Sequence, residues 1–293
     1  MIKDYLVEML EPTILYGFFA GLAGVAAAYH FGNVHLGFAA LAVLASVLAQ
    51  MGVNLIDDYV DFKSGLDKET QATRFSGGSK LVADGIIDAR VVLSIGLAAA
   101  LIAGAIGTYF VFMQLWLLPL IVFGTACVFL YAKYMTRVPF LADPAAALCF
   151  IAISVGCFAI ASGSFANVYL ALLALAPVGM EVAGAVTVNS VPDRDADRKH
   201  RRKNAMSILW DYNKMAKYYL LLQIVAFSIL LYGIVTGAVS YVFLIAFVLI
   251  IPYLYVAKGI SGYKNPDSFE RYMAVQVVAS FAFYLLVIAI YLV

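Results

Sequence analysis

Long apolar runs alternate with shorter polar segments along almost the whole chain. A helix needs about 20 apolar residues to cross the hydrocarbon core of a bilayer. By this criterion the pattern predicts nine transmembrane helices, near residues 12–30, 36–56, 91–111, 115–132, 140–162, 167–190, 215–236, 240–257 and 271–292. Since no Gly/Ser-rich or low-complexity linker divides the chain, we expect a single all-α membrane domain over residues 1–293.

Composition and charge agree with this pattern. Of the residues, 64% are hydrophobic and 13% are charged, whereas soluble domains carry about 25% charged residues. All 19 Lys and Arg residues lie in segments that the nine helices place on one side of the membrane. Because cytoplasmic segments carry the excess of Lys and Arg, we expect a multi-pass protein of the cell (plasma or inner) membrane. Its N-terminus would lie in the cytoplasm and its C-terminus outside. The net charge of +1 argues against a nucleic-acid partner.

Four carboxylates occur close together where the second predicted helix ends. The sequence there is Asn54-Leu-Ile-Asp57-Asp58-Tyr-Val-Asp61-Phe-Lys-Ser-Gly-Leu-Asp67. If this segment is helical, Asp57 and Asp61 share one face, and Asn54 lies one turn before Asp57. Carboxylates this close repel one another and take up protons unless a cation lies among them. Mg²⁺ suits such a site, because one or two carboxylates and a phosphate substrate complete its shell.

A second acidic cluster closes the sixth predicted helix, in Asn189-Ser-Val-Pro-Asp193-Arg-Asp195-Ala-Asp197. Here too Asn and Asp residues recur at spacings of four. Either cluster alone is compatible with a solvated helix end. Two matching clusters on the same side of the membrane favour a shared site instead. We interpret them as a clamp for a diphosphate, facing one another across a cavity.

Basic residues accompany both clusters. The first polar segment continues as Thr73-Arg74-Phe-Ser-Gly77-Gly78-Ser79-Lys80, where Gly-Gly-Ser lets backbone N–H groups approach an anion closely. The second segment carries six Lys and Arg residues, including Arg202 and Lys203. Such residues also serve as topology signals and contact lipid headgroups. A diphosphate needs metal-bound carboxylates and cations, and each of the two polar segments contains both acidic and basic residues.

These residues resemble the UbiA superfamily of intramembrane prenyltransferases, whose members have nine transmembrane helices around a central cavity and two Asp-rich cytoplasmic motifs. The first motif and the Arg74-Phe-Ser-Gly-Gly-Ser79 continuation are most similar to the dihydroxynaphthoate prenyltransferases of menaquinone synthesis. The resemblance implies a UbiA-type prenyltransferase fold and a Mg²⁺-dependent activity. The enzyme would transfer an isoprenoid chain from a prenyl diphosphate to an aromatic acceptor, such as a dihydroxynaphthoate-type quinone precursor, through an allylic carbocation.

The resemblance also implies roles for individual residues. Mg²⁺ binding falls on Asp57, Asp61, Asp67, Asn189, Asp193 and Asp197. The implied catalytic residues are Asp57, Asp61, Asp193, Asp197 and Tyr131. Substrate binding falls on Asn189, Arg137, Arg202 and Lys203. Asn54, Arg74 and Lys80 are further candidates for substrate binding, from their positions beside the first motif and the Gly-Gly-Ser segment. Relatives usually have Asn at the position of Asp57, so this chain departs from the family pattern there.

Glu181 lies about two turns deeper in the sixth predicted helix than Asn189. Ionisable groups at bilayer depth are costly and often functional. We predict that Glu181 lines the acceptor pocket and accepts a proton or a hydrogen bond from a hydroxyl group. The alternative is a protonated carboxyl bonded to a neighbouring helix. Asp143, near an acidic position of relatives, is a further candidate for contact with the acceptor.

Other activities fit parts of the pattern. A CDP-alcohol phosphotransferase would concentrate its aspartates in one Asp-Gly-x-x-Ala-Arg motif, which this sequence lacks. A cation-coupled transporter could place carboxylates at helix ends, but transporters usually bind near the membrane midplane in broken helices. Among prenyltransferases, hydroxybenzoate or a lipid alcohol is an alternative acceptor. The sequence determines neither the length of the donor chain nor the oligomeric state.

Overall fold

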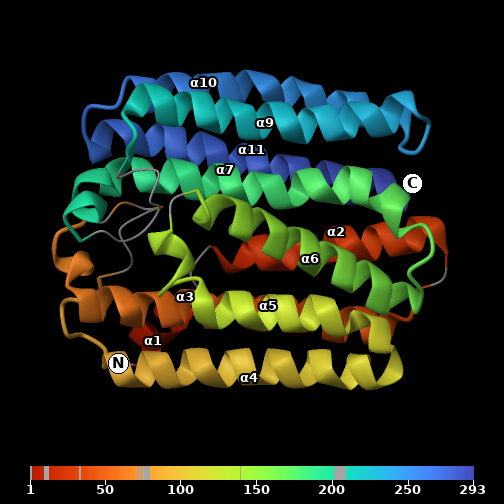
Figure 1. Cartoon of the computed structure of the whole chain (residues 1–293), viewed down its shortest axis with the longest axis horizontal. Coiled ribbons are helices and arrows are strands. Elements are labelled where there is room, and N and C mark those ends of the chain that lie inside the picture. Colours follow the sequence, from red (N-terminus) through yellow and green to blue (C-terminus); the bar gives the residue numbers. More distant parts are fainter. Residues whose placement is uncertain are drawn as a thin grey trace.

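The computed structural model describes residues 2–9, 13–32, 34–71, 73, 75, 80–138, 140–200 and 209–293. Its long helices run side by side in alternating directions (Figure 1). The α-helices of the described chain are α1 (Ile2–Met9), which is short, α2 (Ile14–Phe31), α3 (Leu36–Ser64), α4 (Ala89–Met113), α5 (Leu118–Leu130), α6 (Ala142–Ser162), α7 (Val168–His200), α9 (Tyr212–Val235), α10 (Ile250–Ser261) and α11 (Pro266–Leu292). Short 3₁₀ segments are η1 (Leu66–Lys68), η2 (Leu115–Leu117), η3 (Met135–Arg137) and η4 (Tyr241–Leu249). The described part of the chain contains no strand, and the predicted all-α class is confirmed.

Eight helices of the described chain are long and apolar enough to cross a membrane. They are α2, α3, α4, α6, α7, α9, η4 with α10, and α11. The remaining predicted span is η2 with α5, Leu115–Leu130. At 1.5 Å per residue it is about 24 Å long, shorter than a hydrocarbon core of about 30 Å. The N- and C-termini lie at opposite ends of the bundle (Figure 1), as an odd number of crossings requires. The multi-pass membrane fold is confirmed, and the count of nine stays a prediction.

Both helices that carry the acidic motifs extend past the apolar runs that predicted them. α3 continues from residue 56 to Ser64 and ends at Gly65, whose φ of 77° is left-handed and therefore suits glycine. α7 continues to His200 with Pro192 inside it. The polar segment that follows the sixth predicted span is therefore helical as far as residue 200. A polar sequence ends a membrane span but need not end a helix, because Ala, Arg and Lys favour helices.

α2 and α6 lie in the middle of the bundle. α3, α4 and α5 pack on one side of them, and α7, α9, α10 and α11 on the other (Figure 1). Small residues allow this close packing, as is common between membrane helices. On α2, Ala20, Ala23 and Ala27 are fully buried. The central helices therefore bring the motif-bearing α3 and α7 to either side of one interior space.

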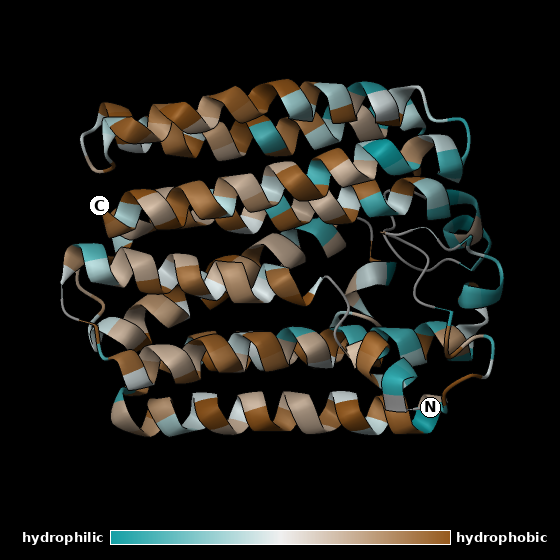
Figure 2. Ribbon diagram, turned by 180° about the vertical axis from the view of Figure 1, so that it is seen from behind, coloured by the Kyte–Doolittle hydropathy of each residue, from teal (hydrophilic) through white to brown (hydrophobic). Residues whose placement is uncertain are grey.

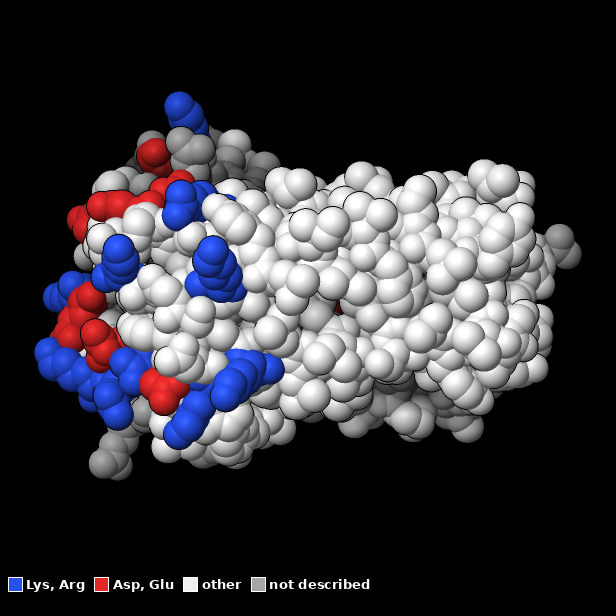
Figure 3. All heavy atoms as spheres, turned by 90° about the horizontal axis from the view of Figure 1, so that it is seen from above, with Lys and Arg blue, Asp and Glu red and all other residues white. Residues whose placement is uncertain are grey.

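Hydrophilic residues gather at the end of the bundle that holds the N-terminus (Figure 2). On the face shown in Figure 3, Lys, Arg, Asp and Glu side chains concentrate at one end. Polar side chains cap the helices that start there. Asp88 accepts from the backbone N–H of Arg90 at 2.7 Å, Asp211 from that of Lys214 and Asn265 from that of Ser268. Such caps satisfy N–H groups that have no partner within the helix.

Candidate functional site

A cavity of about 260 Å³ lies between the polar ends of α3 and α7 and is also bounded by α2, α5 and α6. Residues of both acidic motifs line it: Asn54, Asp57 and Asp58 from α3, and Asn189, Asp193 and Asp197 from α7. Tyr131, which directly follows α5, lines it as well. The structure thus brings together two motifs that are far apart in the chain.

Asn54 is held in place on the α3 wall by two hydrogen bonds. The amide of Gln50, one turn earlier on α3, donates to Asn54 Oδ1 at 2.8 Å. Asn54 Nδ2 in turn donates to Thr13 Oγ1 at 2.6 Å, just before α2. These bonds orient the Asn54 amide and tie α3 to the start of α2. Asp57 and Asp58 follow about one turn later, half-buried at the cavity.

The α7 wall uses one face of the helix, because residues four apart lie above one another. Asp197 is fully buried and Asp193 is half-buried. Asp195, between them, points away, and its side chain is 86% exposed. Arg194 also turns away from the cavity, since its Nε donates to the Trp210 carbonyl at 3.0 Å. The two charges at positions 194 and 195 therefore do not line the cavity.

Several residues assigned to the site from sequence do not line this cavity: Asp61, Asp67, Lys80, Arg137 and Glu181. Asp61 is 2% exposed, on the turn of α3 beyond Asp57 and Asp58. Lys80 Nζ donates to the Asp67 carbonyl at 2.7 Å and to Thr70 Oγ1 at 2.6 Å, so it holds the loop after η1 together. Arg137 is exposed in η3. Arg74, Arg202 and Lys203 lie outside the described residues.

Glu181 is 1% exposed and lies in a polar network between helices. Ser280 Oγ donates to Glu181 Oε2 at 3.0 Å, and Gln276 Nε2 donates to Ser280 Oγ at 2.9 Å. This contact joins α7 to α11, and Glu181 does not line the cavity. Its predicted contact with the acceptor stays a prediction. Asp143 is likewise fully buried and accepts from Thr187 Oγ1 at 3.2 Å, which joins α6 to α7.

The cavity-lining groups provide hard oxygen donors, carboxylates above all, and no described residue that lines it is Lys or Arg. Mg²⁺ prefers such oxygen ligands. Within the described residues, no group of three or more His, Cys, Asp or Glu side chains is close enough to hold a metal ion unaided. Mg²⁺ is commonly bound by one or two carboxylates together with substrate phosphates rather than by an all-protein cage. The donor set therefore fits a Mg²⁺ ion shared with a phosphate-bearing ligand.

The sequence interpretation missed several lining residues, among them Tyr16, Gln50, Phe75 and Thr136. Gln50 carried a usable signal, because it is a polar residue in an apolar run and precedes Asn54 by one helical turn. Tyr16 carried no such signal. It packs on Phe281, with ring centroids 4.9 Å apart, and in the sequence it looks like any other aromatic residue in an apolar run.

A second, apolar cavity of about 130 Å³ is lined by residues of α3, α4, α5 and α6, among them Ala42 and Ala49 of α3, which precede the acidic motif. Its lining is mainly Ala, Gly, Ile, Leu and Phe. Ser46 is one of the few polar residues there, and its hydroxyl donates to the Gly17 carbonyl at 3.0 Å and the Val43 carbonyl at 2.7 Å. Cys149 lines both cavities. The acidic cavity therefore adjoins a largely apolar space inside the membrane-spanning bundle.

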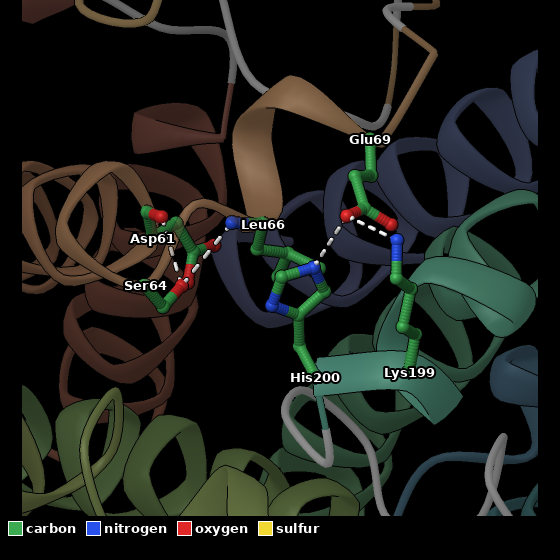
Figure 4. A network of polar contacts seen from close by, with 6 residues as sticks. All are labelled: Asp61, Ser64, Leu66, Glu69, Lys199 and His200. Atoms are coloured by element: carbon green, nitrogen blue, oxygen red, sulfur yellow. Dashed lines mark hydrogen bonds and ion pairs between the residues drawn. The ribbon is translucent and has the colours of Figure 1, made fainter.

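An ion pair connects the two motif-bearing segments at the polar end. Figure 4 shows Glu69, just after η1, pointing toward Lys199 and His200 at the end of α7. Glu69 Oε1 lies 2.7 Å from Lys199 Nζ and 3.1 Å from His200 Nε2. The bond from Lys199, followed by that from His200, holds the pKa of Glu69 below its ordinary value of 4.5.

This ion pair leads to a pH-dependent prediction. A carboxylate with a lowered pKa contributes stability that is complete above its unfolded pKa and is lost as the pH falls through the folded value. We expect Glu69→Gln to speed hydrogen–deuterium exchange in residues 66–71 at neutral pH, and this difference from the wild type to shrink as the pH falls through the lowered pKa of folded Glu69. Lys68→Gln, at an exposed neighbouring residue, is the control. Equal exchange in Glu69→Gln and the wild type at neutral pH would contradict the prediction.

Comparison with known proteins gives one family and one fold. The sequence profile of the UbiA prenyltransferase family matches residues 17–291. A structure of digeranylgeranylglyceryl phosphate synthase is similar, with a TM-score of 0.68, 14% identity and coverage of 99% of this chain and 98% of that chain. The apo structure of a UbiA homologue from Aeropyrum pernix K1 has a TM-score of 0.68 and 18% identity, covering 93% of this chain and 98% of that one. A UbiA homologue from Archaeoglobus fulgidus, bound to DMAPP and Mg²⁺, has a TM-score of 0.60 and 16% identity, with coverage of 97% and 99%. Among the curated proteins, no match was found.

Proposed function

The chain belongs to the UbiA prenyltransferase family, and we propose that it transfers an isoprenoid chain from a prenyl diphosphate to an aromatic acceptor within the membrane. One observation carries this proposal. The two Asn/Asp motifs line a single cavity at the polar end of the bundle, and that cavity adjoins an apolar one. An amphipathic donor, with a charged diphosphate and an apolar tail, matches this pair of spaces.

The diphosphate would lie in the acidic cavity, together with Mg²⁺. One or two of the carboxylates of Asp57, Asp58, Asp193 and Asp197 would hold the metal together with the diphosphate, and the amides of Asn54 and Asn189 would orient the diphosphate. Bound there, Mg²⁺ would supply positive charge against the negative charge that builds on the leaving group. The structure of the Archaeoglobus fulgidus homologue with DMAPP and Mg²⁺ supports this choice of ligands. Asp61 and Asp67, which the resemblance also implies as metal ligands, lie off the lining of the cavity and are left out of this set, and Asn189 is assigned to the diphosphate instead.

The isoprenoid tail would occupy the apolar cavity. Burial of apolar surface contributes about 0.8 kcal/mol for each CH₂ group, so a long tail favours binding within the bundle. The apolar wall would also exclude water from the allylic carbon. Tyr131 and Tyr16, on the wall of the acidic cavity, would place aromatic rings near the developing cation, where their faces stabilise positive charge.

The finer parts of the proposal rest on sequence. The resemblance of the first motif to dihydroxynaphthoate prenyltransferases favours a naphthoquinone precursor as acceptor, which would place the reaction in menaquinone synthesis. The absence of a linker favours a single domain. The basic residues favour a cell-membrane protein with the acidic cavity facing the cytoplasm. A lipid alcohol is the second candidate acceptor, since the fold is shared with digeranylgeranylglyceryl phosphate synthase.

Purified protein in lipid nanodiscs tests the proposal. It would be given geranylgeranyl diphosphate, Mg²⁺ and one acceptor at a time: 1,4-dihydroxy-2-naphthoate, 4-hydroxybenzoate or geranylgeranylglyceryl phosphate. We expect Mg²⁺-dependent release of diphosphate and a prenylated naphthoate by mass spectrometry. A product from only one of the other acceptors would change the assigned acceptor. No diphosphate release with any acceptor, together with cation-driven transport in proteoliposomes, would instead support a transporter.

A further inference from the structure

Three glycines from three different helices line the apolar cavity: Gly104 of α4, Gly124 of α5 and Gly156 of α6. A Cβ atom added at any of them would meet no neighbouring heavy atom within 4 Å. Gly107 also lines the cavity, but a Cβ there would lie 2.9 Å from Ile121 Cδ1. Close helix packing therefore explains Gly107 and does not explain the other three.

Backbone conformation does not explain these three glycines either. None of them has a positive φ, and each lies within a helix, where glycine is less favourable than alanine. Their common property is that they leave open space within the cavity. Alanines such as Ala45, Ala49, Ala103 and Ala152 line other parts of the wall, so small side chains keep the space open along its length.

We propose that Gly104, Gly124 and Gly156 set the upper length of the isoprenoid chain that this protein accepts. This inference rests on the proposed function. A donor whose diphosphate lies among the aspartates would extend past Cys149, which lines both cavities. Its distal isoprene units would then lie against these glycines. A larger side chain at any of the three would occupy the volume that those distal units need, while the diphosphate and the first isoprene unit would keep their contacts.

Matched substitutions on α4 test this inference. Gly104→Leu adds a side chain inside the cavity, and Ala105→Leu adds one at an adjacent exposed residue that does not line it. Each variant and the wild type would be assayed for kcat/KM with prenyl diphosphates of one, two and four isoprene units. For Gly104→Leu we expect the ratio of kcat/KM for the longest donor to kcat/KM for the shortest to fall about tenfold or more. A misfit of even one methylene group in an apolar pocket lowers kcat/KM by about this factor. For Ala105→Leu we expect the wild-type ratio.

Two further variants and a binding measurement distinguish failure of this inference from failure of the proposed function. Gly156→Leu introduces the same change from α6, and the smaller Gly104→Ala provides a variant whose added atom meets no neighbour. Thermal stabilisation of each protein by each donor, without an acceptor, reports binding independently of turnover. Unchanged donor ratios and stabilisation in both Leu variants, with an active wild type, would overturn the inference and leave the proposed function standing. A wild type that neither binds nor cleaves any of the donors would overturn the proposed function itself.

Discussion

Asp193→Asn is expected to lower the rate of diphosphate release by about 10²–10³-fold, the loss typical when one electrostatic contact to a transition state is removed. Asp193 is half-buried on α7 and lines the acidic cavity opposite Asp57 and Asp58 of α3. The substitution keeps the shape of the side chain and removes its charge. It therefore weakens metal binding at the leaving group with little change in packing. The measurement is the initial rate of diphosphate release at saturating donor over a range of Mg²⁺ concentrations.

Asp195→Asn is the matched control for this prediction. Asp195 is on the same helix, two residues away, but its side chain is 86% exposed and turned from the cavity. Its contact with Arg194 is 3.5 Å long, and exposed ion pairs contribute little to stability. We expect this variant to retain the wild-type rate. Equal rates for Asp193→Asn and the wild type, or equal losses in both variants, would show that the cavity-facing carboxylate has no special role.

The acidic motifs illustrate what the sequence could predict. Spacing alone grouped Asn189, Asp193 and Asp197 at intervals of four residues, because helical periodicity is a local property. The same rule grouped Asp57 with Asp61, yet only Asp57 lines the cavity. The turns of α3 that border the cavity are set by the positions at which α2 and α7 cross α3. Those positions depend on tertiary packing, which the local sequence of α3 does not indicate.

Glu181 and the glycines are further cases in which the sequence could not predict a residue's contacts. The depth of Glu181 in the membrane indicated that its carboxyl needs a partner, but the sequence could not name Ser280, which lies on a distant helix. Glycines within apolar runs look alike in sequence. In the structure some leave cavity space open, as Gly156 does, and others let two backbones meet, as Gly24 does. Only coordinates separate these two uses of the same residue.

Gly24→Ala is expected to destabilise the protein strongly. A Cβ at Gly24 of α2 would lie 2.0 Å from the Ser154 carbonyl oxygen of α6 and 3.0 Å from the Phe158 backbone N. Both obstacles are backbone atoms, so relief requires the two central helices to move apart. Overpacking of this kind costs about 1–3 kcal/mol or more, and each kcal/mol lowers the melting temperature of a chain near this size by about 2–4 °C.

Gly156→Ala, on the α6 partner helix, is the control, because its added Cβ meets no atom within 4 Å. Thermal unfolding of both variants in the same detergent is the measurement. We expect a lower melting temperature for Gly24→Ala and an unchanged or slightly higher one for Gly156→Ala, since alanine favours helix. Because α2 and α6 also carry walls of the acidic cavity, Gly24→Ala should weaken stabilisation by prenyl diphosphate and Mg²⁺ as well. A Gly24→Ala protein that melts and binds donor like the wild type would mean that α2 and α6 do not pack as closely as the structure places them.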